Sequence, residues 1–201
     1  MGTHSNKLHL GCFDQILPGW VNTDITLHIF ISKIPGLTFL LFKSGVISEQ
    51  RYLQHRNGIF KSARYLNLRK EFPYQDERFS YVFMGHVLEH LYPNEAIYCL
   101  KEVYRVLRKG GTVRISVPDL DRIVADYDPN LTEVFLELIF ESKQKRDKNR
   151  HHWHYNESSL KKILKEIGFR ECYRCGYREG RCPDLSLTDK RSGSLFVESI
   201  K

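Results

Sequence analysis

The stretch of residues 7–24 constrains the fold more than any other part of the chain. It reads KLHLGCFDQILPGWVNTD, in which Leu8 and Leu10 begin a short apolar strand and Gly11 ends it at a sharp turn. The VNTD segment then predicts a second short strand that ends in the carboxylate of Asp24. A strand, a glycine turn and a second strand with a terminal acid are the layout of a nucleoside site in an open α/β sheet.

This turn is poorly suited to a phosphate anion. A dinucleotide site needs three glycines and a full helix whose N-terminus holds the pyrophosphate. Phe13 stands where the second glycine would be, and Pro18-Gly19 leaves room for barely one helical turn. A nucleoside without phosphate fits better, and S-adenosylmethionine is such a ligand. The alternative interpretation is an ordinary tight turn with no ligand.

Strands and helices alternate along the rest of the chain. Apolar runs predict strands at residues 64–68, 79–84, 113–118, 169–177 and 195–200. Helical periodicity predicts helices over residues 95–108, 120–127 and about 132–142, and between Asn156 and Gly168. This alternation indicates an α/β fold with a mainly parallel sheet and helices on both faces. Ligands then bind beyond the carboxyl ends of the strands, which are Gly11-Cys12, Asp24, Leu68, Gly85-His86 and Pro118-Asp119.

The 201 residues are expected to form a single domain. Residues 25–62 are its least regular part, because Pro35-Gly36 and Gly45 interrupt their apolar clusters before a basic helical pattern begins at Ser48. We interpret residues 25–62 as an insertion of one or two helices. This insertion is either a lid over the substrate or extra core packed on the sheet edge, and a membrane-surface element is a third alternative.

Charge and cysteine content limit the partners and the compartment. A formal charge of +7 favours an anionic partner such as nucleic acid, a membrane surface or an acidic substrate, although it also serves solubility alone. Five cysteines in a chain without a secretory signal predict reduced thiols and a cytoplasmic location. The longest apolar run, residues 37–42, is too short to span a bilayer, so we expect at most peripheral membrane contact.

Several longer segments match one known family. The segments LHLGC with PGWVNTD, FPYQDERFSYVFMGHVLEHL and EVYRVLRKGGTVRISVPDL resemble the class I S-adenosylmethionine-dependent methyltransferases. The narrower likeness is to the small bacterial predicted-methyltransferase group of the methyltransferase type 11 kind, and it extends to HHWHYNESSLKKILKEIGF, GRCPDL and SLFVESI. The resemblance implies a Rossmann-like, mainly parallel seven-stranded sheet with an antiparallel last strand. It also implies methyl transfer from S-adenosyl-L-methionine to an acceptor.

The resemblance also implies where the cofactor lies. Gly11 and Cys12 match the turn beside its methionine moiety, and Asp24 matches the carboxylate on its ribose. The complete set of expected cofactor-binding residues is Gly11, Cys12, Phe13, Asp24, Asn67, Leu68, Gly85 and His86. Two positions depart from the family pattern, which has an acid at His9 and a second glycine at Phe13. Phe13 either weakens cofactor binding or closes the site as an apolar wall.

A methyl acceptor with a hydroxyl or amine group must lose a proton, and a histidine near neutrality suits that task. The candidates are His86, His152 and His154, with Asp119 able to orient one of them. Each lies at a predicted strand end or in the loop that follows residue 142. We therefore expect the catalytic residues among these four.

Two groups of residues also match metal-binding patterns. Residues 86–90 read H-x-x-E-H, a zinc-peptidase signature, but Tyr92-Pro93 follows at once and leaves too short a helix. Cys172 and Cys175, with Cys182 and the histidines at 151, 152 and 154, are a second pattern. Cys172 and Cys175 are an odd number of residues apart on a predicted strand, so they point to opposite faces. We expect buried free thiols, structural histidines and no bound metal.

Three functions remain open. The first is a methyltransferase that acts on a small molecule or a glycan-type acceptor. The second is an RNA methyltransferase, because residues 143–154 interleave basic side chains with Trp153 and are followed by Tyr155, although a solvated charge run explains residues 143–150 equally well. The third is a non-catalytic binding protein that retains the fold, argued from Phe13.

Overall fold

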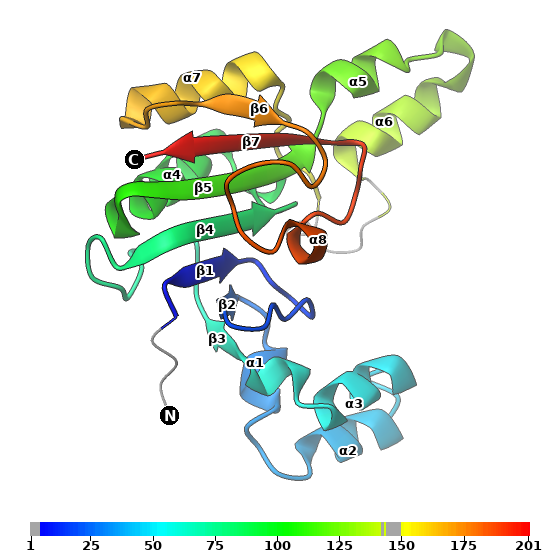
Figure 1. Cartoon of the computed structure of the whole chain (residues 1–201). Helices are drawn as coiled ribbons and strands as arrows, with labels where there is room; N and C mark the ends of the chain where they lie inside the picture. The colour runs from blue at the N-terminus through cyan, green and yellow to red at the C-terminus, as the bar shows by residue number, and fades with distance from the viewer. Residues whose placement is uncertain (1–4, 142, 144–149) are drawn as a thin grey trace.

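The computed structural model describes residues 5–141, 143 and 150–201. These residues form a seven-stranded sheet in the order β3-β2-β1-β4-β5-β7-β6, shown in Figure 1. The strands are β1 Lys7–Leu10, β2 Val21–Asp24, β3 Ala63–Tyr65, β4 Phe79–Gly85, β5 Leu107–Pro118, β6 Tyr173–Cys175 and β7 Ser194–Ile200. Strands β3, β2, β1, β4 and β5 are parallel, and β7 runs antiparallel to both of its neighbours, β5 and β6. The predicted mainly parallel sheet with an antiparallel last strand is confirmed.

Helices pack around this sheet. The described helices are α1 His28–Ile31, α2 Leu37–Lys43, α3 Glu49–Arg56, α4 Pro93–Val106, α5 Leu120–Ala125, α6 Thr132–Phe140, α7 Glu157–Ile167 and α8 Leu185–Thr188, with short 3-10 helices η1 Ile59–Lys61, η2 Leu88–His90 and η3 Pro129–Leu131. Helices α4 and α7 pack on each other and against β5 and β7. Figure 1 shows α4 behind the sheet and α8 in front of it.

The main core lies between the sheet and helices α4 and α7. Helix α4 contributes buried apolar residues three and four positions apart, among them Ala96, Leu100 and Val103, so one face of the helix is fully covered. Leu160 and Leu164 do the same from α7. The expected caps of α7 are confirmed, because the Asn156 side chain accepts the backbone N–H of Ser159 and Gly168 ends the helix with a left-handed backbone.

Several element boundaries differ from the sequence-based expectation. Helix α4 ends at Val106, and Gly110-Gly111 lie inside β5 instead of terminating the helix. A Cβ on Gly111 would lie 2.8 Å from the Arg108 carbonyl oxygen, so close packing of the β5 backbone explains this glycine. Strands β3 and β6 are shorter than the predicted 64–68 and 169–177, because each lies at a sheet edge with only one neighbour to pair with.

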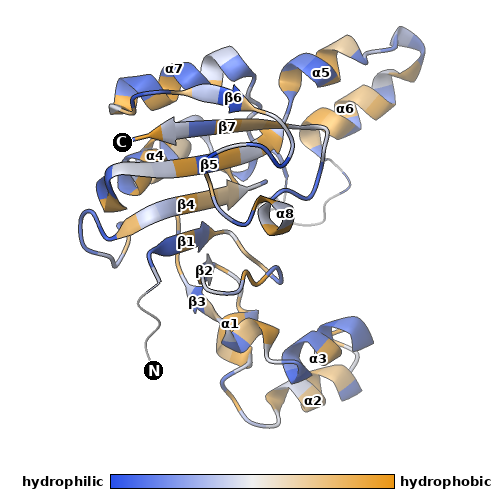
Figure 2. Ribbon diagram, in the orientation of Figure 1, coloured by the Kyte–Doolittle hydropathy of each residue, from blue (hydrophilic) through white to orange (hydrophobic). Residues whose placement is uncertain are grey.

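The insertion contains more helices than the one or two predicted. Residues 25–62 form α1, α2, α3 and η1, and Figure 1 shows α2 and α3 beyond the β3 edge of the sheet. Helices α2 and α6 have no buried residues, and Figure 2 shows much of both in orange, the colour of hydrophobic residues. Every helix within the described residues is too short or too polar to cross a bilayer.

Candidate functional site

The turn after β1 is tightly packed against the segment that follows β4. Gly11 has a φ of 69°, in the left-handed region that favours glycine. A Cβ at this position would lie 2.3 Å from Cγ2 of Val87. Gly11 therefore allows the turn after β1 to pack against the Val87 side chain.

Phe13 adopts a glycine-like backbone although it carries a ring. Its φ is 42°, which is costly for a residue with a Cβ. Its backbone N–H donates to Oδ2 of Asp24 at 2.9 Å, and the N–H of Thr26 donates to Oδ1 at 2.7 Å. The Asp24 carboxylate thus holds the turn after β1 against the end of β2, which compensates for the backbone strain at Phe13.

The Phe13 ring contacts the insertion. The Arg51 guanidinium of α3 lies 4.5 Å from the centre of this ring, and the ring of Phe60 lies edge-on at 6.2 Å. Gln54, also of α3, donates to Oδ2 of Asp14 at 2.9 Å. Residues of the insertion therefore contact two consecutive residues of the turn, Phe13 and Asp14.

His9 occupies the position where the family pattern has an acid. Its side chain is buried, and its Nδ1 lies 3.1 Å from Oδ1 of Asn22. Burial lowers the pKa of His9 to about 4, because the buried imidazolium would lose its hydration. Asn22 also exchanges hydrogen bonds with the backbone of Leu17. His9 and Asn22 are therefore buried and uncharged, and their hydrogen bonds connect β1 to the loop formed by residues 11–20.

A cleft of about 200 Å³ lies at the carboxyl ends of β1, β4 and β5. Its lining residues are His9, Gly11, Cys12, Phe13, Asp14, Gln15, Phe83, Gly85, His86, Ser116, Thr188, Lys190 and Arg191. The expected cofactor residues Gly11, Cys12, Phe13, Gly85 and His86 are brought together here. The volume is below the roughly 300–1,000 Å³ typical of small-molecule sites.

Thr188, Lys190 and Arg191 line this cleft and were missed by the sequence analysis. They belong to the segment that follows GRCPDL. That motif contributed to the family resemblance, but it gave no indication that the segment after it contacts the site. The buried Arg114 of β5 holds this segment in place. Its Nε donates to Oδ1 of Asp189 at 2.9 Å, and its Nη1 donates to the carbonyl oxygen of Glu179 at 2.9 Å.

His86 lies at the rim of the cleft in a strained conformation. Its φ is 53°, and its backbone N–H donates to the Ser116 carbonyl oxygen at 2.8 Å. Its Nδ1 lies 3.1 Å from Oε1 of Glu89, and its Nε2 lies 2.9 Å from Oγ of Ser194. An ionised Glu89 can only accept, so Nδ1 carries the proton and Nε2 is the basic nitrogen.

The other predicted site residues lie outside this cleft. Asn67 accepts the N–H of Arg69, and Leu68 packs against the main core. Asp24 touches the turn without lining the cleft. Asp119 precedes α5 without capping it, and instead pairs with Arg174 at 2.8 Å.

The two remaining catalytic candidates also point elsewhere. His152 stacks on Tyr92 with ring centres 4.3 Å apart, and Nε2 of His154 donates to the Ile139 carbonyl oxygen at 2.6 Å. Neither lines the cleft. Oδ2 of Asp119 bonds to Arg174 in the structure, and the expectation that Asp119 orients one of the candidate histidines stays a prediction.

The structure groups the potential metal ligands differently from both sequence patterns, the H-x-x-E-H segment and the cysteines with nearby histidines. His86 and His90 do not converge, because His86 faces Glu89 and Ser194. Glu89, His90 and His151 instead place one potential ligand atom each within 4.8 Å of one another. All five cysteines are free; Cys175 is half-buried and the other four are buried, as predicted for structural thiols.

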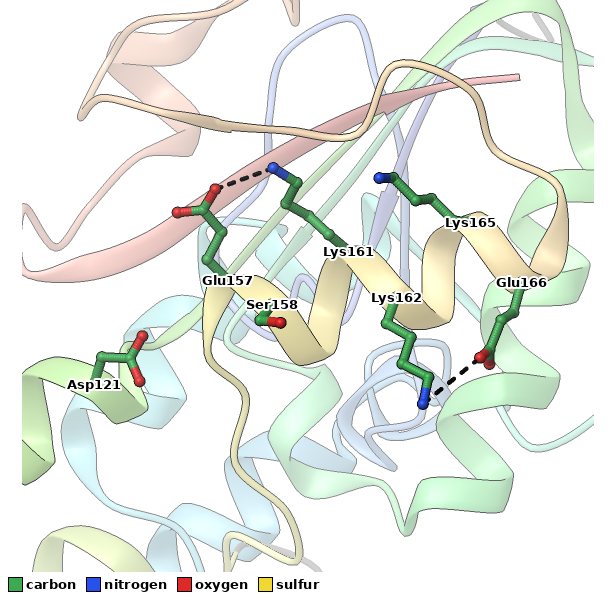
Figure 3. A pocket seen from close by; sticks show the side chains of 7 residues that line it. All are labelled: Asp121, Glu157, Ser158, Lys161, Lys162, Lys165 and Glu166. Carbon is green, nitrogen blue, oxygen red and sulfur yellow. Dashed lines mark hydrogen bonds and ion pairs between the residues drawn. The ribbon is translucent and has the colours of Figure 1, made fainter.

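A second hollow, of about 640 Å³, runs along the exposed surface of α7. Figure 3 shows Lys161 paired with Glu157, and Lys162 paired with Glu166. These are pairs four residues apart on one helix, which typically add about 0.2–0.5 kcal/mol each to helix stability. Four of the seven lining side chains form these pairs along an open surface, so this hollow is not a candidate functional site.

Comparisons with known proteins agree with the fold. Residues 46–115 match the family described as a methyltransferase domain. No curated protein matches the chain. A SAM-dependent methyltransferase from Archaeoglobus fulgidus is similar in structure, with a TM-score of 0.55, 13% sequence identity and coverage of 97% of this chain and 85% of that one. A SAM-dependent methyltransferase and possible histamine N-methyltransferase from Thermotoga maritima has a TM-score of 0.54 and 15% identity, with coverage of 97% and 81%.

A third similar structure, PigF with SAH, has a TM-score of 0.50 and 14% identity, and the match covers 97% of this chain and 49% of that one. The matched methyltransferase-domain family binds S-adenosylmethionine, which agrees with the cofactor that the resemblance implies. The narrower likeness to the small bacterial group stays a prediction. The family match and the sheet topology together confirm the resemblance to the class I S-adenosylmethionine-dependent methyltransferases, whose fold this chain has.

Proposed function

We propose that this protein is an S-adenosylmethionine-dependent methyltransferase that acts on a small-molecule or glycan-type acceptor. The observation that carries the proposal is the convergence of the β1 glycine turn, the ends of β4 and β5, and the Asp24 carboxylate on one edge of the sheet. This edge is where ligands bind in open α/β sheets. We also propose that residues 1–201 act as one methyltransferase domain.

The charges of the cleft suit the methionine end of this cofactor. Lys190 and Arg191 provide positive charge for a carboxylate, and Asp14 provides negative charge for an ammonium group. Asp24 at the end of β2 is placed to accept hydrogen bonds from ribose hydroxyls, since its neighbours Phe13 and Thr26 already hold its orientation. Asn67 and Leu68 follow β3 and are proposed to flank the adenine.

His86 is the residue that we propose as general base. When bound, the cofactor supplies an electrophilic methyl carbon, and the C–S electron pair leaves with the sulfur as an acceptor oxygen or nitrogen attacks. The acceptor proton passes to Nε2 of His86, whose Nδ1–H is held by Glu89 at 3.1 Å. In the structure that nitrogen faces Ser194, so the acceptor must take the place of this contact at 2.9 Å.

The insertion is proposed to act as a lid. The cleft is smaller than typical ligand sites. Contacts from α3 reach the turn at Phe13 and Asp14, and the α3 helix itself has only one buried residue, His55. Displacement of α3 would widen the cleft at the cost of a few partly buried polar contacts and of the contact between Arg51 and the Phe13 ring.

The RNA methyltransferase alternative rests on the charge of +7 and on the basic and aromatic side chains of residues 143–155, of which residues 144–149 lie outside the described part of the structure. Lys190 and Arg191 add positive charge in the cleft. RNA binding through phosphates would weaken steeply with added salt. The alternative of a non-catalytic binding protein predicts cofactor binding without turnover. One experiment separates the three functions: incubation with methyl-labelled S-adenosylmethionine and separate pools of RNA, glycans and small molecules, followed by detection of the labelled product.

The proposal expects label in the small-molecule or glycan pools, and none in RNA. It also expects His86→Ala to lose transfer by about 100-fold or more at saturating cofactor, the usual contribution of a general base. Label found only in RNA would show that the acceptor is RNA and not a small molecule or glycan. Cofactor binding with no transfer to any pool would favour the non-catalytic alternative.

A further inference from the structure

Three side chains with metal-ligand chemistry meet beside the candidate site. Glu89 and His90 come from η2, directly after β4, and His151 comes from the segment before α7. One potential ligand atom of each lies within 4.8 Å of the other two. A spacing of this order is what ligands around a single ion require, since metal–nitrogen and metal–oxygen bonds are about 2.0–2.2 Å long.

Backbone hydrogen bonds hold these two distant segments together. The carbonyl oxygen of Glu89 accepts the N–H of His152 at 2.8 Å and the N–H of Trp153 at 3.2 Å. Nδ1 of His90 lies 3.0 Å from the Arg150 carbonyl oxygen, to which it can only donate. The His90 ring is therefore fixed as the tautomer whose Nε2 carries the lone pair, an arrangement common in metal-binding histidines.

Two buried atoms of this cluster lack hydrogen-bond partners within the described residues. Oε2 of Glu89 is fully buried and has no hydrogen-bond partner within the described residues, and the same is true of Nδ1 of His151. Nε2 of His151 lies 3.3 Å from Oε1 of Glu141, which can orient the ring. A buried carboxylate oxygen without a donor or cation is costly, so these atoms indicate a missing positive ligand.

We propose that Glu89, His90 and His151 bind one divalent first-row transition-metal ion. Two imidazole nitrogens and one carboxylate oxygen suit zinc, cobalt or iron, whereas magnesium and calcium prefer sites made of oxygen ligands. Three protein ligands leave at least one coordination position for water or another small ligand. The H-x-x-E-H signature therefore contributes Glu89 and His90 to this site, and His86 has a different role.

The metal site adjoins the cleft without depending on its function. Oε1 of Glu89 contacts Nδ1 of His86 at the cleft rim, while Oε2 has no hydrogen-bond partner within the described residues. One carboxylate thus orients the proposed base and ligates the ion. Metal binding requires neither S-adenosylmethionine nor a methyl acceptor, so it can be measured whether or not the proposed function is correct.

The test is a titration of the metal-free full-length protein with Co²⁺, followed by its visible absorption, and with Zn²⁺ by calorimetry. We expect one ion per chain. We expect binding to weaken by more than about 100-fold in Glu89→Gln and in His151→Gln. Loss of a ligand should weaken metal affinity by more than the 10–100-fold that is typical when a residue hydrogen-bonded to a ligand is replaced. Glu89→Gln keeps the side-chain shape and removes a buried charge, so it should remain folded.

Two matched variants serve as controls. His152→Gln changes the adjacent imidazole, which stacks on Tyr92, and Cys175→Ser removes the half-buried thiol. Both should bind Co²⁺ and Zn²⁺ like the wild type, and Zn²⁺ should raise the Tm of both but not that of Glu89→Gln. The proposal is overturned by absence of stoichiometric binding in the wild type, by undiminished binding in Glu89→Gln or His151→Gln, or by loss only in Cys175→Ser.

Discussion

Asp24 accepts the backbone N–H of Phe13 at 2.9 Å, across the turn that joins β1 to β2. This contact explains how a phenylalanine takes the left-handed position that a glycine occupies in the family pattern. The carboxylate that is expected to hold the ribose also fixes the backbone of the turn. The two departures from the family pattern are therefore both accommodated by hydrogen bonds, a buried one at His9 and an exposed one at Phe13.

Two substitutions of Phe13 should distinguish the energetic cost of its backbone conformation from the energetic contribution of its ring contacts. Phe13→Gly relieves the positive φ but loses the contacts with Arg51 and Phe60, so the free energy of unfolding should change by less than about 1 kcal/mol. Phe13→Ala loses the same contacts without that relief and should be about 1–2 kcal/mol less stable than Phe13→Gly. Urea unfolding measures both values. Equal stability of the two variants would show that the turn is not strained.

The Gly11–Val87 contact should be visible as an energetic coupling. Gly11→Ala should lower the free energy of unfolding by about 2 kcal/mol or more, because its Cβ would lie 2.3 Å from Val87 and its φ is positive. Val87→Ala removes the obstructing methyl groups. The double variant should be more stable than the sum of the single effects predicts, by at least about 0.5 kcal/mol. Strictly additive effects would contradict this close approach.

Stability should fall in mild acid because His9 is buried in its neutral form. Burial lowers its pKa from 6.5 to about 4, so the unfolded chain binds this proton more tightly than the folded one. The free energy of unfolding is therefore highest above pH 6.5 and falls as the pH drops toward 4, by up to about 3 kcal/mol from this residue. Burial also lowers the pKa values of His55 and His151, which act in the same direction.

The comparison that isolates His9 is His9→Gln, which cannot be protonated in this range. Its unfolding free energy should depend less steeply on pH between 6.5 and 4 than that of the wild type. Chemical unfolding at a series of pH values gives both curves. Parallel curves would show that His9 does not control the acid response.

Arg114 should be needed for the wall of the cleft formed by Thr188, Lys190 and Arg191. Its guanidinium is fully buried and pairs with Asp189 and Glu198. Arg114→Met leaves two buried carboxylates unpaired and should cost about 3–5 kcal/mol of stability, measured by urea unfolding. Arg122→Met is the control, since that side chain is 62% exposed and its replacement should stay within about 0.5 kcal/mol. A similar small effect at both positions would contradict the role of Arg114.

Local signals in the sequence predicted the parts of the fold that depend on local chemistry. Strand β2 and the caps of α7 at Asn156 and Gly168 lie where turn and capping residues indicated. The glycine turn and the cleft residues Gly85 and His86 followed from the rule that ligands bind at strand ends. These features need only residues close together in the chain or a known sheet geometry.

The remainder depends on contacts between distant residues. Arg114 and Asp189 are 75 positions apart, and their ion pair helps to bring the loop that follows β6 to the cleft. His90 and Arg150 are 60 positions apart, so no local spacing could show that His151 lies against Glu89. Asp119 was expected beside a histidine, but Arg174 from β6 bonds to its Oδ2, a contact that the sequence alone does not reveal.

The account is tested most directly by calorimetric titration of the wild type and of Asp24→Asn with S-adenosylmethionine. The wild type should bind one molecule per chain, and saturation at about one hundred times the dissociation constant should stabilise it by about 2.7 kcal/mol. Asp24→Asn should bind about 10–100-fold more weakly, because it loses a charged hydrogen-bond acceptor. Asp126→Asn, a side chain that is 72% exposed, should bind like the wild type. Absence of binding to the wild type, or equal affinity in Asp24→Asn, would contradict a cofactor site organised around residue 24.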